Sequence, residues 1–239
     1  MISMANTGMG EITADERSGP ARRRIAIDMD GVLVDTFPAQ LAFISHEYGL
    51  SPDPDQRLRQ ALADWLPGEA LAGLRRHMHR PEFFAGLPPM QGAIDVLRRL
   101  VDRYDVFIAT AAMEYPNSLA PKFDWLRRHV PFIDPLQYIF CGHKYMLDVD
   151  WLIDDHVRHF VALRGTPMLF TAPHNRQLTG YLRVDDWQDV ARHLEGAAVA
   201  AGATPRHEPE GVWTALVSRE TPGNATRRGD EPHHLRSRK

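Results

Sequence analysis

Residues Ile25 to Asp35 read Ile-Ala-Ile-Asp-Met-Asp-Gly-Val-Leu-Val-Asp, and this stretch decides the predicted fold. Its apolar start is typical of a short buried strand, in which successive side chains point to opposite faces of a sheet. Asp28 and Asp30 follow, and Gly31 then allows the backbone to turn tightly. Two crowded carboxylates cost free energy unless a cation or a shared proton compensates their charge. The stretch therefore predicts a strand that ends in a divalent-metal site suited to acid–base chemistry.

Short apolar runs alternate with helical patterns along the middle of the chain. Strands are expected at 24–27, 105–109, 138–141, 151–153 and 168–171, the last of the series. Helices are expected at 37–48, 92–103 and 120–130, with shorter helices inside 51–80. This alternation is typical of an α/β fold with a doubly wound, mostly parallel sheet.

The spacing of these elements also predicts a division into domains. Residues 37–88 interrupt the rhythm between the first two strands, and so long a crossover with helices of its own indicates a small helical cap. The catalytic core would then comprise residues 24–36 and 89–195. Residues 1–23 are polar and aperiodic, and residues 196–239 contain few large apolar side chains. We expect a disordered leader and a disordered tail, because such segments cannot bury enough surface to offset their ordering entropy.

The composition limits the class of protein. With 239 residues, of which 44% are hydrophobic, the chain can bury a substantial core. Its 28 basic and 31 acidic side chains give a net charge of −3, which favours neither nucleic acid nor a membrane surface as partner. The single cysteine, Cys141, excludes an intrachain disulfide and suits a reducing compartment. We therefore expect a cytoplasmic protein, with a homodimer among the assemblies that the sequence leaves open.

Polar side chains follow the ends of the expected strands, where open parallel sheets bind their ligands. Thr110 follows the second strand, Lys144 lies in a later loop, and Asp154 and Asp155 end the fourth strand. Mg²⁺ prefers a few carboxylates, several waters and a substrate phosphate. A lysine and a hydroxyl can hold the remaining phosphate oxygens. The pattern predicts phosphate chemistry that depends on Mg²⁺.

In this order, the residues resemble the four motifs of the haloacid dehalogenase superfamily of phosphatases. The matching segments are Asp28-Met-Asp-Gly-Val-Leu-Val-Asp, Phe107-Ile-Ala-Thr-Ala, Lys144 and Leu152-Ile-Asp-Asp. Within that superfamily the chain is most similar to the 5′(3′)-deoxyribonucleotidases, or type C 5′-nucleotidases, through Pro81-Glu-Phe-Phe, Lys122-Phe-Asp-Trp-Leu-Arg and His174-Asn-Arg. The resemblance runs from residue 24 to residue 195. It implies a phosphatase that acts on a nucleoside 5′-monophosphate, in particular a deoxyribonucleotide.

The resemblance also implies a role for each carboxylate. Asp28 would be the nucleophile that forms an aspartyl-phosphate. Asp30 would protonate the leaving alcohol and then deprotonate the attacking water. Asp28, the main-chain carbonyl of Asp30 and Asp155 would bind Mg²⁺, and Asp154 would orient this metal shell.

Substrate-binding roles follow from the same resemblance. Thr110 and Lys144 would bind the phosphoryl oxygens, and Trp65 in the cap would stack on the base. Ala111 replaces the serine that usually follows the threonine, and Thr36 stands where an aromatic residue is expected. Both departures bear on the base and sugar preference more than on the phosphatase chemistry.

Several alternatives remain open. The substrate could be another small phosphate ester. Alternatively, the chain could be a catalytically weak nucleotide-binding protein, an interpretation motivated by Ala111 and the long tails. Trp65, Phe83 and Phe84 are aromatic residues that more often form cap core than stacking platforms. His156 and His159 follow the carboxylates, but no further ligand stands at zinc spacing, so structural roles are expected for them.

Overall fold

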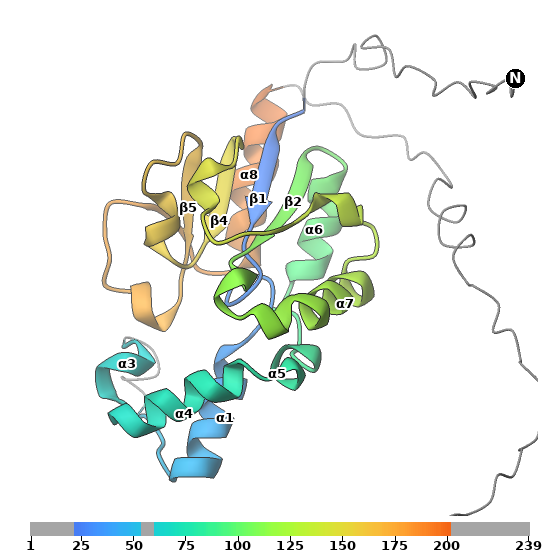
Figure 1. Ribbon diagram of the computed structural model, residues 1–239. Coiled ribbons are helices and arrows are strands. Elements are labelled where there is room, and N and C mark those ends of the chain that lie inside the picture. The colour runs from blue at the N-terminus through green and yellow to red at the C-terminus, as the bar shows by residue number, and fades with distance from the viewer. Residues whose placement is uncertain (1–21, 54–59, 202–239) are drawn as a thin grey trace, which may run out of the picture. The chain divides into compact units, whose positions relative to one another are not determined.

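Six parallel strands form the centre of the fold (Figure 1). The computed structural model describes residues 22–53 and 60–201. Its strands are β1 (Arg24–Ile27), β2 (Asp105–Thr110), β3 (Tyr138–Phe140), β4 (Trp151–Asp154), β5 (Thr166–Phe170) and β6 (Leu182–Val184). The strand order is β3-β2-β1-β4-β5-β6, and every pairing between these strands is parallel. The predicted doubly wound α/β class is confirmed.

The order of the strands reverses at β1. This strand pairs with β2 on one side, where Ile27 lies opposite Ile108, and with β4 on the other, where Ile27 lies opposite Ile153. From β1 the chain therefore adds β2 and β3 on one side, and it later adds β4, β5 and β6 on the other side. In such sheets, ligands bind in the crevice at the carboxyl ends of the strands beside this reversal.

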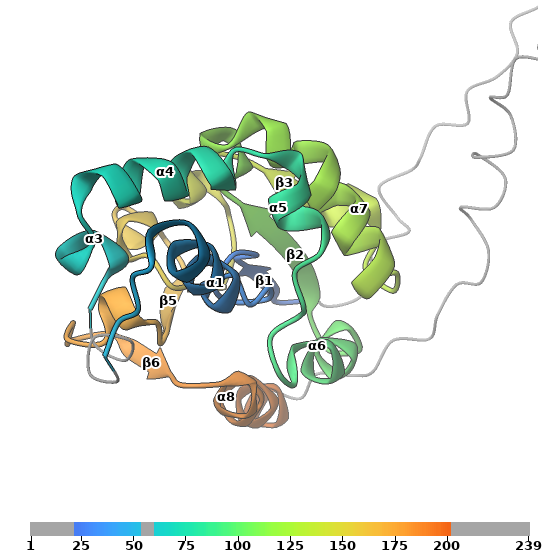
Figure 2. The same cartoon turned by 90° about the horizontal axis from the view of Figure 1, so that it is seen from below.

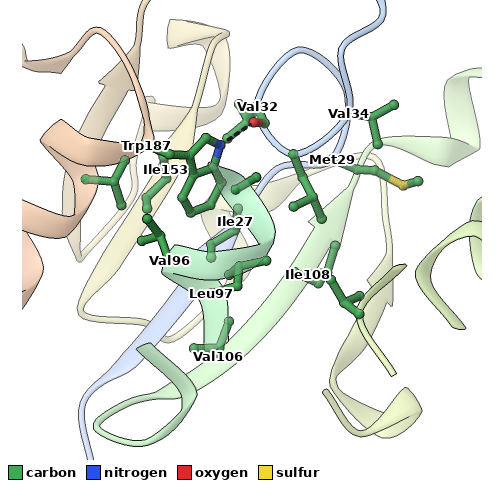
Figure 3. Close-up of a cluster of buried hydrophobic side chains, with 14 of the residues drawn as sticks. Ile27, Met29, Val32, Val34, Val96, Leu97, Val106, Ile108, Ile153 and Trp187 are labelled. Atoms are coloured by element: carbon green, nitrogen blue, oxygen red, sulfur yellow. Dashed lines mark hydrogen bonds between the residues drawn. The ribbon is translucent and has the colours of Figure 1, made fainter. Parts of the chain in front are cut away.

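Helices α6 (Ala93–Val101), α7 (Leu119–His129) and α8 (Trp187–Ala201) contribute to the main hydrophobic core on one face of the sheet. Figure 3 shows part of this core, in which Ile27 lies near the side chains of α6 and Trp187. The Trp187 indole Nε1 donates to the main-chain oxygen of Val32 at 2.8 Å. Ala26, between two core isoleucines, belongs to a smaller cluster on the opposite face, as the twofold repeat of a strand requires.

Among the described residues, four of the helices that precede α6 lie beyond the carboxyl ends of the strands (Figures 1 and 2). They are α1 (Phe37–Tyr48), α3 (Leu62–Trp65), α4 (Gly68–Met78) and α5 (Pro81–Ala85). The bounds of α1 match the prediction. Gly49 follows its last residue as the C-cap, and the φ of 63° at Gly49 is the left-handed conformation that favours glycine.

These helices have two kinds of packing. A second hydrophobic cluster, separate from the main core, joins α1 and α4 through Ile44, Ala70 and Leu74. Phe83 and Phe84 of α5 instead belong to the main core. Phe83 and Phe84 therefore pack in the hydrophobic core and do not form a stacking platform, which agrees with the more frequent role of such residues.

Short 3₁₀ turns connect the remaining elements. They span Ala112–Glu114, Pro116–Ser118, Pro135–Gln137, Lys144–Met146, Val157–Phe160 and Pro173–Asn175. Several of these turns follow the carboxyl ends of strands, so they place side chains at the crevice without a long helix.

The end of the folded region differs from the prediction. β5 is not the last strand, because β6 and α8 follow it. α8 continues to Ala201, past the predicted start of the tail at Gly196, and alanine is the strongest helix former. The predicted leader, up to residue 21, and the rest of the predicted tail lie outside the described residues. Within residues 22–53 and 60–201, no helix combines the length and apolar character that crossing a bilayer requires.

Candidate active site

Three carboxylates converge at the carboxyl ends of β1 and β4. The side chains of Asp28, Asp154 and Asp155 are buried, and each offers an oxygen within 4.8 Å of the others. The Asp28 N–H donates to the main-chain oxygen of Ile153 at 2.9 Å, which extends the pairing of the two strands to the site. The neighbouring strands thus bring together residues that are more than a hundred positions apart in the sequence.

Lys144 is buried inside this carboxylate cluster. Its Nζ lies 2.6 Å from Asp28 Oδ1 and 2.6 Å from Asp154 Oδ2. Burial alone would lower the pKa of Lys144, but the two carboxylates raise it above its ordinary value, so the ammonium group stays charged. Asp154 Oδ1 accepts from the main-chain N–H of His156 at 2.8 Å. Both oxygens of Asp154 are therefore engaged by the protein.

The Asp155 carboxylate lies against Gly31. A Cβ placed on Gly31 would approach Asp155 Oδ2 to 2.6 Å, and the φ of Gly31 is +76°. Burial, and then the charges of Asp28 and Asp154, raise the pKa of Asp155 well above its ordinary value. Burial and the charge of Asp28 likewise raise the pKa of Asp154 to about 7. These shifts mark an excess of buried negative charge that Lys144 does not fully compensate.

This donor set fits a hard divalent cation. The Asp28 and Asp155 carboxylates supply the oxygen ligands that such ions prefer, and a cation between them would offset the uncompensated charge. Gly31 provides the room that the Asp155 carboxylate needs. The site residues can therefore hold a metal of this class.

Asp30 has a separate partner that the sequence analysis missed. Lys122, fully buried on α7, forms an ion pair with Asp30 Oδ2 and also donates to Thr110 Oγ1 at 3.1 Å. Burial raises the pKa of Asp30, while Lys122 lowers it and Asp28 raises it. The signal was present in the helix pattern, because Lys122 shares the buried face of α7 with Trp125 and Leu126. A lysine on an apolar face needs an anionic partner.

A cavity of about 450 Å³ opens beside the carboxylates. Asp28, Asp30 and Asp155 line it from the strand ends, and residues from the helices between β1 and β2 line its other side, namely Phe37, Gln40, Leu62 and Met78. The volume falls in the range of about 300 to 1,000 Å³ that is typical of small-molecule sites. The acidic cluster thus opens onto a space that can hold a small ligand.

The structure does not bring every predicted binding residue to this cavity. Thr110 is buried behind it, bonded to Lys122, and the following Ala111 lines the cavity instead. Trp65 is half-buried against the second hydrophobic cluster, and Leu62 of the same helix lines the cavity. Phe37, one residue after the position where an aromatic residue was expected, does line it.

Three histidines line the cavity next to Asp155. Burial is the main cause that lowers the pKa of His156 and of His159 to about 4, and burial also lowers the pKa of His174. The sequence analysis expected structural roles for His156 and His159 and cited His174 only as part of the resemblance. His174 in fact reaches back to the carboxylate cluster, where its Nε2 lies 2.9 Å from the main-chain oxygen of Asp155.

Several known proteins are similar to this chain over most of its length. A haloacid dehalogenase-like hydrolase from Streptococcus pneumoniae superposes with a TM-score of 0.49 at 17% sequence identity, covering 72% of this chain and 98% of that chain. A Staphylococcus aureus Mu50 protein named "Putative 5'(3')-deoxyribonucleotidase" is 38% identical over 72% of this chain and 96% of its own length. The 5'(3')-deoxyribonucleotidase of Bacillus subtilis 168 is 30% identical over 72% of this chain and 99% of its own length.

The match to a family is equally extensive. Residues 22–200 match the family described as "5' nucleotidase, deoxy (Pyrimidine), cytosolic type C protein". This range includes all four motifs and the helices between β1 and β2, and it agrees with the resemblance drawn from the motifs. The chain therefore belongs to this family of phosphoric monoester hydrolases.

Proposed function

We propose that the protein is a Mg²⁺-dependent phosphomonoesterase that hydrolyses a nucleoside 5′-monophosphate, preferentially a deoxyribonucleotide, through an aspartyl-phosphate. The observation that carries the proposal is the buried cluster of Asp28, Asp154 and Asp155, which opens onto the 450 Å³ cavity. The relatives named as deoxyribonucleotidases support the nucleotide substrate. Cys141, which is half-buried and free, suits the reducing cytoplasm in which we expect the enzyme to act.

The proposed metal ligands are Asp28, Asp155 and the main-chain carbonyl of Asp30. Bound there, Mg²⁺ would neutralise charge on the carboxylates and on the phosphate that approaches them. Asp154 would not bind directly, because Lys144 and the N–H of His156 occupy its two oxygens. It would instead fix Lys144 beside Asp28 and so orient the shell.

Asp28 and Asp30 would share the chemistry. A carboxylate oxygen of Asp28 attacks phosphorus, and the bond between phosphorus and the 5′-oxygen breaks while Asp30 donates its proton to that oxygen. Water then attacks the phosphorus of the acyl phosphate and gives a proton to Asp30. The bond between phosphorus and the Asp28 oxygen breaks, and this step releases inorganic phosphate and regenerates the Asp28 carboxylate. The burial that raises the pKa of Asp30 favours the protonated form that the first step needs.

Each of the two buried lysines would stabilise a different negative charge in the reaction. Lys144 pairs with Asp28, and we assign to it the neutralisation of the phosphoryl oxygens as the bond forms. Lys122 pairs with Asp30 and donates to Thr110, so it would lower the pKa of the acid and fix the position of the buried threonine behind the cavity. Each catalytic carboxylate would thus have its own lysine.

Residues 37–88 would form the cap that selects the leaving group, and the core would comprise residues 24–36 and 89–195. Phe37, Gln40, Leu62 and Met78 line the side of the cavity away from the carboxylates, which suits contact with a nucleoside. Trp65 would support the α3 helix that carries Leu62, or reach the base itself if the cap shifts on binding.

The test is phosphate release from a panel of nucleoside monophosphates and sugar phosphates in Mg²⁺, with and without a chelator. Nucleotide-selective release that the chelator abolishes and added Mg²⁺ restores is the expected result. Release from sugar phosphates alone would discard the nucleotide substrate and keep the chemistry. Nucleotide binding without release from any ester would contradict the proposed activity.

A further inference from the structure

Asp155 belongs to a second group of potential metal ligands. Asp155, His156 and His174 each offer a ligand atom within 4.8 Å of the other two, and all three line the cavity. The rings of His156 and His174 lie with their centroids 4.2 Å apart and their planes inclined at 60°. Two imidazoles and a carboxylate therefore converge on one point of the cavity wall, beside the cluster formed by Asp28, Asp154 and Asp155.

The fold holds this group in place from behind. The main-chain oxygen of Asp155 accepts from Asn175 Nδ2 at 2.8 Å as well as from His174 Nε2. Asn175 is fully buried and also donates to the main-chain oxygen of Phe170 at 2.7 Å. If His174 turns a nitrogen toward an ion, the Asp155 oxygen still keeps Asn175 as donor, so metal binding leaves no buried carbonyl without a hydrogen bond.

The ligand types decide which ion suits the group. Imidazole nitrogen suits Zn²⁺ and similar transition metals, whereas Mg²⁺ and Ca²⁺ prefer oxygen alone. Two histidines and one carboxylate with a remaining position open to solvent are a ligand set that Zn²⁺ accepts. The cavity provides that open position.

We propose that Asp155, His156 and His174 form a binding site for Zn²⁺ that shares Asp155 with the Mg²⁺ site, and that Zn²⁺ bound there inhibits the enzyme. The inhibitory part rests on the proposed function, because it assumes that Asp155 is a ligand of the catalytic Mg²⁺. A carboxylate drawn toward the two imidazoles is withdrawn from the position beside Gly31. The histidine pair would then act as a competitor for one carboxylate.

The binding test is a calorimetric titration of the 239-residue chain with ZnCl₂, first without Mg²⁺ and then in saturating Mg²⁺. The variants are His156→Ala and His174→Gln. The matched control is His46→Ala, since His46 is exposed and pairs with Glu47 at the surface. His207, His233 and His234 are common to all four proteins, so their contribution cancels. The proposal expects the affinity for one equivalent of Zn²⁺ to fall by more than about tenfold in both site variants. In the control this affinity should stay unchanged.

Two further readouts make the outcome decisive. Melting temperatures show whether each variant is folded, and His156→Asn replaces His156→Ala if the latter is not. Equal Zn²⁺ stoichiometry and affinity in all folded variants would overturn the site. Zn²⁺ that binds the wild type but leaves its phosphate release unaffected would overturn the inhibition. Failure of every phosphate ester to react would contradict the proposed function, while the calorimetric result would still decide the Zn²⁺ site.

Discussion

Gly31 and Asp155 are packed so closely that no side chain fits between them. A Cβ on Gly31 would meet Asp155 Oδ2 at 2.6 Å. We expect Gly31→Ala to displace that carboxylate and to lower Mg²⁺ affinity and turnover by at least about tenfold, a loss comparable with that of a metal-orienting group.

The matched control is Gly49→Ala. Gly49 also has a positive φ, at 63°, but apart from its chain neighbours no heavy atom of the described residues lies within 4 Å of its Cβ position. Both variants carry a similar backbone cost of order 1–3 kcal/mol. Chemical denaturation should therefore show comparable destabilisation, and only Gly31→Ala should lose Mg²⁺ affinity, measured by titrating the activity with Mg²⁺. Equal losses of activity in both would contradict the role of the Gly31–Asp155 contact.

Asp28→Asn should abolish turnover and leave the fold intact, because the amide has the shape of the carboxylate but is a poor nucleophile. The measurement is phosphate release beside circular dichroism. Asp124→Asn, an exposed substitution on α7, is the control and should retain wild-type turnover. Substantial activity in Asp28→Asn would show that the covalent mechanism is wrong.

Lys122→Met should move the acid limb of the pH–rate profile to higher pH. Lys122 lowers the pKa of Asp30, so its removal raises that pKa further. Asp30 must be deprotonated to accept a proton from water, and a higher pKa delays this state to higher pH. Thr110→Val removes only the second acceptor of Lys122 and should leave the limb in place. An acid limb at the same pH in Lys122→Met and in the wild type would show that Lys122 does not set the pKa of Asp30 in the reaction.

Acid should destabilise the protein between pH 6.5 and about pH 4 in part through His159. Burial first, and then the charge of Lys144, lower the pKa of its imidazole from 6.5 to about 4. As the pH falls through this window, the unfolded chain binds the proton before the folded chain does. Stability therefore falls by up to about 1.4 kcal/mol per pH unit from this group. Denaturation of His159→Gln across the same window should show a shallower loss, and an identical slope would exclude this histidine as a cause.

Local patterns in the sequence predicted the elements that local interactions determine. The strand before Asp28 and the helix from Phe37 to Gly49 follow from an apolar run, a turn and a glycine in the left-handed conformation. Asp154 and Asp155 meet Asp28 because parallel strands end at a common edge, which the order of the motifs already indicated. The sheet and the acidic cluster were therefore accessible from sequence.

The features that were missed depend on contacts distant in sequence. Lys122 pairs with Asp30, which lies 92 positions earlier in the turn after β1, and nothing near Lys122 in the chain shows that Asp30 is there. His174 reaches Asp155 across 19 positions, which no zinc spacing describes. Trp65 was expected to stack on the nucleotide base, but its ring packs against the second hydrophobic cluster. In each case burial, which is a property of the whole fold, decided where the side chain lies.

The hydrogen bond from Trp187 to Val32 spans 155 positions. Val32 lies in the turn that directly follows Asp30 and Gly31, whereas Trp187 opens the last helix. Ribosomes make the turn early and the helix late. The turn beside the two carboxylates proposed for catalysis thus gains this support only when synthesis of the folded region is nearly complete, and a chain released before residue 187 lacks it.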